Sequence, residues 1–387
     1  MMAEGDMVLI EQAEQPIRVL QVLRGGPICG GIENFVMNYY RHIDRTRVQF
    51  DFLVHSQEKG YYDDEILALG GRIYYFSLLD DKNIPGYIGD LFRFFREHKE
   101  YQIVHGQVRG FAPVYFTVAA LCGVPVRISH SHASGVEPTM MGRILNFVVR
   151  SIKYPSNVHW ACSRQAGEYM YGKRFAFEVI PNAVSTQRFC PNEARRRAIR
   201  QEMGIDGQFV VGNIGRFCLQ KNQKFLLQVF KEILLLRPGS VLLLIGEGKL
   251  EAELRTEIQR LGLEPYVLVI ETKSNIEDYY RAMDVFVLPS IFEGFPMVLT
   301  EAQACGIPCV ASTNVTTEIN FSGDISFIPL QSPPEVWAES AVSAKMNQDP
   351  AVFMQESGYD IRQAAKMLTE MYEVLANKPP KEPTGGL

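Results

Sequence analysis

The chain has 387 residues, with 39 basic and 44 acidic side chains and a formal net charge of −5. Its composition, 47% hydrophobic and 21% charged, is that of an ordinary globular protein, which excludes intrinsic disorder, collagen and a small disulfide scaffold. The length favours two or three domains. The mildly acidic balance argues against bulk nucleic-acid binding, because duplex affinity comes mostly from a basic surface. We therefore expect any phosphate recognition to be local.

Neither the cysteines nor the hydrophobic segments indicate export. The seven cysteines are odd in number and form no CxxC pair, so we interpret them as reduced thiols. The first 15 residues are acidic where a signal peptide is basic, and no apolar core follows them. The longest apolar stretch, residues 111–126, is broken by proline and glycine and is shorter than the roughly 18 residues that indicate a spanning helix. These features predict a cytoplasmic protein.

After a tail at residues 1–15 that we expect to be disordered, short β-branched runs alternate with stretches of helical period. This pattern is typical of βα units around a parallel sheet. In the first half we expect strands at residues 17–23, 48–54, 72–76, 102–105, 126–130 and 158–162, and a strand-like segment at 177–184. Helices are expected at residues 34–43, 87–98 and 163–171.

The second half repeats the alternation, with strands expected at residues 210–214, 241–245, 267–270, 285–288 and 308–311. The chain is therefore predicted to be an α/β protein with two doubly wound parallel-sheet domains, at residues 16–185 and 186–349. Such sheets bind ligands at the carboxyl ends of their strands, so two facing domains enclose a cleft. Residues 350–376 are expected to be helical, and residues 377–387 to form a disordered tail.

A glycine-rich loop, RGGPICGGIE, follows the first expected strand and precedes a helix expected to start near Glu33. Glycines there let backbone N–H groups approach an anion at a helix N-terminus. Gly31 and Ile32 stand where a Walker A loop needs Lys and Ser or Thr, and the GxGxxG fingerprint is absent. These departures disfavour both a P-loop NTPase and a dinucleotide site. A turn needed only for chain reversal is the alternative.

Two cations follow the first strand of the second half, in GNIGRFCLQKN at residues 212–222. Arg216 and Lys221 precede a helix at the carboxyl end of that strand. Fixed cations at this position suit a diphosphate, whose charge rises as a nucleotide departs. Solvated surface cations are the alternative interpretation of these two residues.

Two glutamates flank a Gly-Phe-Pro turn in residues 288–312. Pro296 suits the first position of the following helix, because proline has no N–H to leave unpaired. Glu293 precedes this turn and Glu301 lies eight residues later in the helix. One carboxylate can accept hydrogen bonds from sugar hydroxyls and the other from a ribose. Stabilisation of the helix dipole is the alternative role for both.

Taken together, these segments resemble the donor-site signature of the GT-B-fold retaining glycosyltransferases of family 4, the glycosyl transferases group 1 of bacterial polysaccharide biosynthesis. The motifs that carry the resemblance are Glu293-Gly-Phe-Pro, Glu301 with Ala-x-x-x-Gly-x-Pro after it, Gly215-Arg216, Lys221-Asn222, Gly30-Gly31-x-Glu33 and Pro181-Asn182. The resemblance implies the GT-B fold, two Rossmann-like domains facing across a cleft, with the C-terminal helices crossing back to the N-terminal domain.

The family's activity is transfer of a sugar from a nucleotide diphosphate sugar with retention at the anomeric carbon. The resemblance therefore implies a hexose or N-acetylhexosamine donor, with UDP favoured over GDP and ADP, and a saccharide or lipid-linked acceptor in cell-surface or exopolysaccharide synthesis. It implies no cofactor and no metal, in agreement with the absence of an Asp-x-Asp motif. In this type of mechanism the leaving phosphate takes the acceptor proton.

The resemblance also assigns roles to residues. Arg216 and Lys221 would stabilise the departing diphosphate, Glu293 would bind the donor sugar and Glu301 the ribose. Further donor contacts are expected from Gly30, Gly31, Gly215, Lys273, Ser274, Asn275, Ile276, Gly294, Phe295, Pro296, Met297 and Val298.

Two histidines follow an expected strand in RISHSHASG and share one face of it. The family keeps a histidine near the reacting sugar at this position, and the sequence leaves open whether it is His130 or His132. His-x-His is also a metal-ligand spacing, but a third ligand is unspecified. His105, after its own strand, is expected to be structural or to line the cleft.

Three rival functions remain at this point: a nucleotide-sugar epimerase of the same architecture, a non-catalytic nucleotide-binding subunit, and a dehydrogenase. Two segments mix cations with apolar residues, at residues 87–99 and 194–203. Each could contact an anionic membrane from the inner face or could be an ordinary helix surface packed on the core.

Overall fold

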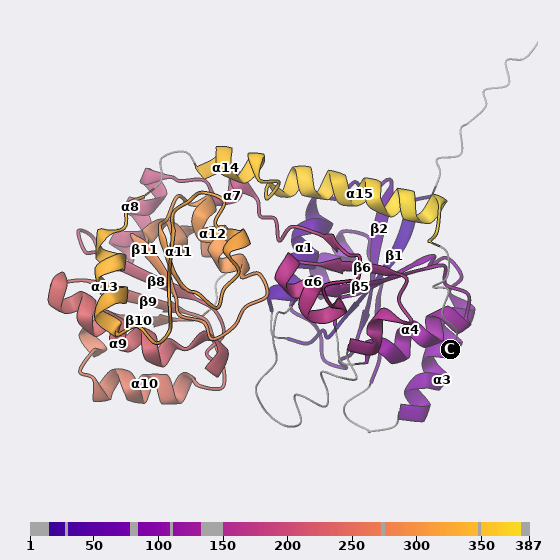
Figure 1. The fold of residues 1–387 in the computed structure, drawn as a ribbon, viewed down its shortest axis with the longest axis horizontal. Coiled ribbons are helices and arrows are strands. Elements are labelled where there is room, and N and C mark those ends of the chain that lie inside the picture. Colours follow the sequence, from indigo (N-terminus) through magenta and orange to yellow (C-terminus); the bar gives the residue numbers. More distant parts are fainter. Residues whose placement is uncertain are drawn as a thin grey trace, which may run out of the picture.

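The computed structural model describes residues 15–27, 30–77, 84–108, 111–132, 150–271, 275–346 and 350–380. Of the two expected tails, these ranges include only residue 15 and residues 377–380, and Asn377 is the last residue of a helix rather than part of a disordered tail. Lys273 and Ser274 lie outside the described ranges. The described chain forms two parallel sheets that lie side by side, each flanked by helices (Figure 1). None of the described helices is long and apolar enough to span a bilayer.

The N-terminal sheet has seven parallel strands in the order β3-β2-β1-β4-β5-β6-β7. Its strands are β1 (Ile17–Leu23), β2 (Val48–Val54), β3 (Ile73–Tyr75), β4 (Ile103–Gly106), β5 (Val126–Ser131), β6 (Val158–Ala161) and β7 (Glu178–Val179). Its helices are α1 (Gly31–His42), α2 (Asp63–Ala68), α3 (Ile84–Glu97), α4 (Ala112–Leu121) and α6 (Arg164–Tyr171), with a 3-10 turn at Arg150–Lys153. The strand order reverses between β1 and β4, the position where open α/β sheets bind ligands.

The C-terminal sheet has six parallel strands in the order β10-β9-β8-β11-β12-β13, with the same reversal between β8 and β11. Its strands are β8 (Val210–Ile214), β9 (Val241–Ile245), β10 (Val267–Ile270), β11 (Val285–Leu288), β12 (Cys309–Ser312) and β13 (Ile325–Ile328). Its helices are α7 (Thr186–Phe189), α8 (Glu193–Glu202), α9 (Gln223–Leu236), α10 (Glu251–Arg260), α11 (Ile276–Ala282), α12 (Met297–Ala304) and α13 (Pro334–Ser343), with 3-10 turns at Leu219–Lys221, Glu264–Tyr266 and Thr317–Ile319.

Strands covered by helices on both faces have no solvent face, so their sequences are apolar without alternation. Every residue of β9 and β11 is apolar and buried. Strand β2 is equally buried but carries Gln49 and Asp51, and Asp51 pairs with Arg18. One hydrophobic cluster continues from the N-terminal sheet into the C-terminal half and includes Trp160, Phe189 and Leu299. The two sheets therefore share a core on one side.

The last two helices divide between the two halves. Helix α14 (Pro350–Glu356) packs against α12, whereas α15 (Ile361–Asn377) packs against α1, β1 and β2 and lies along the top of the N-terminal half (Figure 1). The expected return to the N-terminal domain is thus made by α15 alone. Its amphipathic face buries Leu368 and Tyr372 in the shared core.

Most expected elements are confirmed within two or three residues, and one differs by more. The strand expected at 177–184 shrinks to two residues because Pro181 cannot donate a strand hydrogen bond. Helix α1 begins at Gly31, before the start expected near Glu33. The basic run at 194–203 belongs to α8, where Arg195 binds Asp278, and Arg196 and Arg200 both bind Asp284. Those arginines attach α8 to the neighbouring elements.

Candidate functional site

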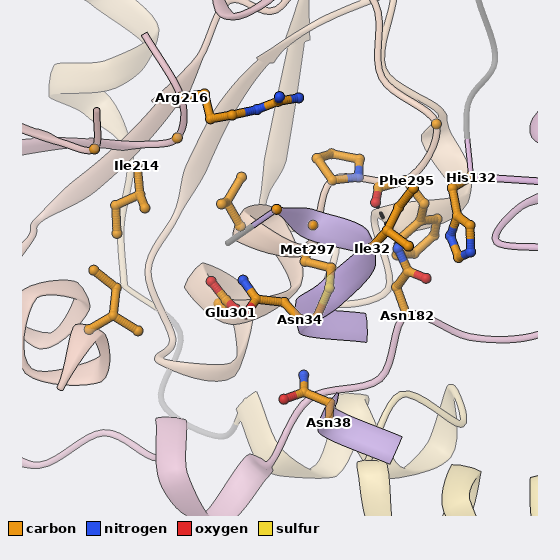
Figure 2. Close-up of a pocket in the computed structure, with 18 of the residues that line it drawn as sticks. Ile32, Asn34, Asn38, His132, Asn182, Ile214, Arg216, Phe295, Met297 and Glu301 are labelled. Carbon is orange, nitrogen blue, oxygen red and sulfur yellow. Dashed lines mark hydrogen bonds between the residues drawn. The ribbon is translucent and has the colours of Figure 1, made fainter. Parts of the chain in front are cut away.

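A cavity of about 890 Å³ is lined by loops from both halves of the molecule (Figure 2). On the N-terminal side its lining follows the ends of β1, β4 and β5, and on the C-terminal side the ends of β8, β9 and β11. Parallel strands present their carboxyl ends at one edge of the sheet, so the two ligand-binding edges face the same space. The cavity is therefore the predicted cleft.

The C-terminal side supplies a cation paired with a carboxylate. Lys221 Nζ lies 2.8 Å from Glu293 Oε1, and Ser290 Oγ donates to the same oxygen at 2.8 Å. Gln220 Nε2 lies 3.3 Å from the other oxygen of Glu293. An ammonium group has three donors, so Lys221 keeps protons for a second anion while it holds Glu293. The guanidinium of Arg216 extends over the same cavity (Figure 2).

The backbone around these cations has unusual conformations. Asn222, between Lys221 and α9, is left-handed with φ 56°, a conformation that asparagine tolerates better than most residues. Gly246 has φ 147°, and a Cβ there would lie 2.2 Å from the carbonyl oxygen of Gly215. The loops after β8 and β9 therefore approach each other more closely than side chains at these positions would allow, which opens the backbone to a ligand.

The turn after Glu293 is fixed by hydrogen bonds from the N-terminal half. Ser163 Oγ donates to the carbonyl of Gly294 at 3.1 Å, and Asn182 Nδ2 donates to the carbonyl of Phe295 at 2.9 Å (Figure 2). In a trans peptide the following N–H points opposite to the carbonyl, so the Phe295 N–H is directed away from Ser163. Beyond the turn, α12 begins at Met297, and the first N–H groups of a helix have no acceptor within it. The turn and the helix start thus provide N–H donors at the cavity.

Glu301 lies farther along α12 and also borders the cavity. Its Oε2 accepts a hydrogen bond from Tyr280 OH at 2.7 Å. Burial raises the pKa of the Glu301 carboxyl to about 7, although the Tyr280 hydrogen bond and the charge of Arg188 both act to lower it. Close to neutral pH the Glu301 carboxyl is therefore a mixture of its protonated form, which can donate a hydrogen bond, and its ionised form, which only accepts.

The N-terminal side contributes the start of α1. Gly30 is the N-cap of this helix and, with Gly31, lines the cavity. Glu33 in the first turn is mostly buried, and burial raises the pKa of its carboxyl, while hydrogen bonds to its own backbone and Gly30 and the charges of Arg216 and Arg24 act to lower it. The start of α1 and Arg216 of the C-terminal half thus line the same cavity.

The structure separates the two histidines that the sequence left open. His132 lines the cavity, and its Nε2 lies 2.6 Å from Gln107 Oε1. His130 is 3% exposed and lies behind it, with Nδ1 3.1 Å from His105 Nε2. The two rings of His130 and His132 stack with centroids 4.2 Å apart. Of the pair, His132 is the one placed to contact a ligand.

Comparison with known proteins identifies the family. The model for Glycosyltransferase Family 4 matches residues 29–188, and the model for Glycosyl transferases group 1 matches residues 195–319. The candidate glycosyltransferase EpsF of Bacillus subtilis is 33% identical over 376 residues, which cover 93% of this chain and 97% of EpsF. The chain belongs to the family 4 glycosyltransferases.

Other relatives of this glycosyltransferase support the same conclusion. The Escherichia coli UDP-Gal:alpha-D-GlcNAc-diphosphoundecaprenol alpha-1,3-galactosyltransferase is 26% identical, with 74% of this chain and 77% of that protein covered. Among solved structures, Anabaena HepE in complex with UDP-glucose superimposes with a TM-score of 0.75 at 18% identity, covering 92% of this chain and all of HepE. The likeness to HepE establishes the GT-B fold, as the sequence predicted.

Most residues predicted for the donor site line this one cavity. They are Gly30, Gly31, His132, Gly215, Arg216, Lys221, Ile276, Glu293, Gly294, Phe295, Pro296, Met297, Val298 and Glu301. Asn275 is instead bonded to Asp278, and His130 is buried behind His132. The helical position expected for Pro296 is wrong by one residue: Pro296 is the N-cap of α12, because its ψ of 107° is extended rather than helical, and its carbonyl accepts from the N–H of Leu299.

Several lining residues were not anticipated from the sequence. Gln107 follows β4, Arg188 lies in α7, and Glu247 follows β9. Arg188 also pairs with Glu277 at 2.8 Å. Each of these residues comes directly after a strand or in a short helix at the domain junction, and position after a strand is the signal that could have identified Gln107 and Glu247. Nothing in the local sequence marks Arg188.

Proposed function

We propose that this glycosyltransferase moves a hexose or N-acetylhexosamine from a UDP-sugar, with retention of the anomeric configuration, to a saccharide or lipid-linked acceptor in cell-surface polysaccharide synthesis. The observation that carries the proposal is the cavity in which Arg216, Lys221 and Glu293 converge from loops at the carboxyl edge of the C-terminal sheet. EpsF and the Escherichia coli galactosyltransferase support a polysaccharide or lipid-linked acceptor, and the UDP-glucose held by HepE supports UDP.

In the proposed reaction the diphosphate lies against Arg216, Lys221 and the N–H groups at the start of α12. As the bond from the anomeric carbon to the phosphate oxygen breaks, these donors stabilise the negative charge on the leaving diphosphate. Glu293 accepts hydrogen bonds from donor-sugar hydroxyls, and Glu301 accepts them from the ribose. The acceptor hydroxyl attacks from the face that the phosphate leaves, and its proton passes to the leaving phosphate oxygen.

The test is transfer with defined donors and acceptors. Purified protein is incubated with UDP-glucose, UDP-galactose, UDP-N-acetylglucosamine or GDP-mannose, with and without a GlcNAc-diphospho-lipid acceptor. Nucleotide release that depends on the acceptor, with an α-linked product by NMR, is the expected result. Sugar interconversion without an acceptor would instead indicate an epimerase, and turnover of NAD(P)H a dehydrogenase.

We also propose that the reaction needs no metal ion. The positive charge that the leaving diphosphate requires is available from Arg216 and Lys221. Within the described ranges, no group of three or more His, Cys, Asp and Glu side chains is arranged to hold a metal ion. Activity is expected to survive dialysis against EDTA, whereas restoration of lost activity by Mg²⁺ or Mn²⁺ would contradict the proposal.

A lipid-linked acceptor would bring the protein to the inner face of the membrane, and we propose α3 as the contact. Arg93 and Arg96 are exposed on this helix, Phe92 lies beside Arg96 with 5.5 Å from ring centroid to guanidinium, and Ile84 is 50% exposed. Cations interleaved with apolar side chains favour anionic lipid. Binding to phosphatidylglycerol vesicles should weaken in Arg93→Glu/Arg96→Glu and persist in Arg255→Glu/Arg260→Glu on α10. Equal binding by both variants would contradict this role of α3.

A further inference from the structure

A chain of buried polar side chains connects the cavity to the C-terminal helix. It begins at His132, passes through Gln107 and Gln21, and ends at Tyr372 of α15. Gln21, Gln107 and Tyr372 are each at most 1% exposed. These residues come from β1, the loop after β4 and a helix about 265 positions farther along the sequence than Gln107. Buried polar groups need partners, so each member constrains the next.

The orientations of the two glutamine amides give the hydrogen bonds of this chain one direction. Gln21 Nε2 donates to Tyr372 OH at 3.2 Å, and Gln107 Nε2 donates to Gln21 Oε1 at 2.8 Å. Gln107 therefore presents its carbonyl oxygen to His132, at 2.6 Å from Nε2. A carbonyl oxygen only accepts, so His132 Nε2 must carry a proton. In the neutral ring Nδ1 is then an acceptor.

A second branch starts at Tyr372 and reaches the face of the His132 ring through His105 and His130. Because Tyr372 OH accepts from Gln21, its own proton is available to His105 Nδ1, at 2.6 Å. His105 Nε2 in turn lies 3.1 Å from His130 Nδ1. Complete burial lowers the pKa of His105 and of His130 well below the usual value, so both rings are neutral.

The first branch restrains movement of the His132 ring within its own plane, and the second restrains movement perpendicular to that plane. Gln107 fixes the edge that carries Nε2, while His130 stacks on the face, with the ring of Phe35 5.0 Å from both histidines. A ring held in both directions loses little further freedom when a ligand binds.

We propose that Gln107 is a positioning residue of the donor site: it fixes His132 as the Nε2–H tautomer and holds this ring at the wall of the cavity that the donor sugar would occupy, and Tyr372 orients Gln107 through Gln21. The C-terminal helix is thereby part of the active site without touching the substrate. This inference rests on the proposed function, because it assigns His132 to the donor sugar.

The test combines ring-¹⁵N NMR with kinetics. Gln107→Met keeps the length of the side chain and removes its hydrogen bonds, and Tyr372→Phe removes only the distant hydroxyl. Tyr101→Phe is the control, because its buried hydroxyl donates to Asp51 at 2.8 Å and belongs to neither branch. The His132 signals are assigned by their loss in His132→Gln.

The wild type is expected to show His132 protonated at Nε2. In Gln107→Met the tautomers should mix and kcat should fall about tenfold, while the Kd for UDP stays within about twofold. Tyr372→Phe should change both readouts in the same direction, and Tyr101→Phe neither. A wild-type His132 protonated at Nδ1, or a Gln107→Met variant with unchanged tautomer and kcat, would overturn the inference. The tautomer is measured without turnover, so an inactive wild type would count against the proposed function and not against this network.

Discussion

Lys221 and Glu293 bind each other at 2.8 Å, although the proposed mechanism assigns them to different parts of the donor. The side chains are 14% and 9% exposed, so neither charge is well solvated. Removing one partner of such a pair leaves the other buried without compensation. The pair therefore sets the position of both groups before a donor arrives, and each should depend on the other.

Lys221→Ala and Glu293→Ala are each expected to lower kcat/KM by roughly 10²-fold, the usual effect of deleting a charge partner of the transition state. The double variant should lose less than the product of the two single losses, because the residues act together. Steady-state kinetics with saturating acceptor measures all three. Lys224→Ala is the control, since Lys224 forms an equivalent 2.8 Å pair with Glu253 on the exposed surface. Wild-type rates in either single variant would contradict the site assignment.

Glu301 should make donor binding depend on pH. The pKa of its carboxyl is about 7, so the carboxylate that we propose accepts from the ribose predominates only above that pH. Below pH 7 binding must expel a proton, and the affinity for UDP-glucose should fall by up to about tenfold per pH unit. Calorimetry from pH 5.5 to 8.5 checks this. Glu301→Gln should bind more weakly at pH 8 with a flat profile, and a variant that kept the wild-type slope would assign the titration to another group.

At the scale of elements, α15 stabilises a domain to which it is not adjacent in sequence. Leu368 is 2% exposed and packs into the shared core, whereas Val374 on the same helix is 65% exposed. Leu368→Ala is expected to lower the free energy of unfolding by about 2–5 kcal/mol, and Val374→Ala by less than about 0.5 kcal/mol. Urea denaturation measures both. Equal effects would show that α15 does not depend on this face for its docking.

The sequence predicted most of these elements because buried parallel strands are continuous apolar runs, and residues 241–245 carry that signal unmixed. It missed β13, whose four residues include Ser326 and follow directly after a Gly-Asp turn. Such a short run is indistinguishable from a loop until β12 provides a partner. That α15 returns to the N-terminal domain was predicted only from the family resemblance, because the amphipathic pattern of a helix does not indicate which core the helix packs against.

For the site, the sequence indicated residues whose chemistry is local: Arg216, Lys221 and Glu293 follow strands, and Glu301 lies in the helix after Glu293, all with recognisable spacing. It could not distinguish His130 from His132, because strand period places both on one face. The choice depends on where β5 ends and on what lies beyond it, and Gln107 from the neighbouring strand supplies the partner. Local sequence patterns do not predict contacts between segments that are distant in the sequence, such as that of His132 with Gln107.

At the scale of the whole molecule, the two halves meet at the turn that follows Glu293. Ser163 and Asn182 both donate from the N-terminal half to carbonyls of that turn. A third contact joins the N–H of Arg164 to Glu318. Donor-binding geometry in the C-terminal half is therefore partly determined by side chains of the other half, which gives a structural reason for Pro181-Asn182 to resemble the family at the junction.

Asn182 offers the sharpest test of this dependence. It is 5% exposed, and Asn182→Ala leaves the buried Phe295 carbonyl without its donor. The free energy of unfolding should fall by about 1–3 kcal/mol, the usual penalty for an unsatisfied buried group, and UDP-glucose should bind more weakly because the turn is no longer held. Asn314→Ala is the matched control: Asn314 Nδ2 donates to the carbonyl of Ile291 in the same loop at 2.8 Å, but from an exposed position within the C-terminal half. That variant should stay within about 0.5 kcal/mol of the wild type and keep its affinity. If both variants behaved alike in urea denaturation and calorimetry, the position of the turn would be independent of the N-terminal half.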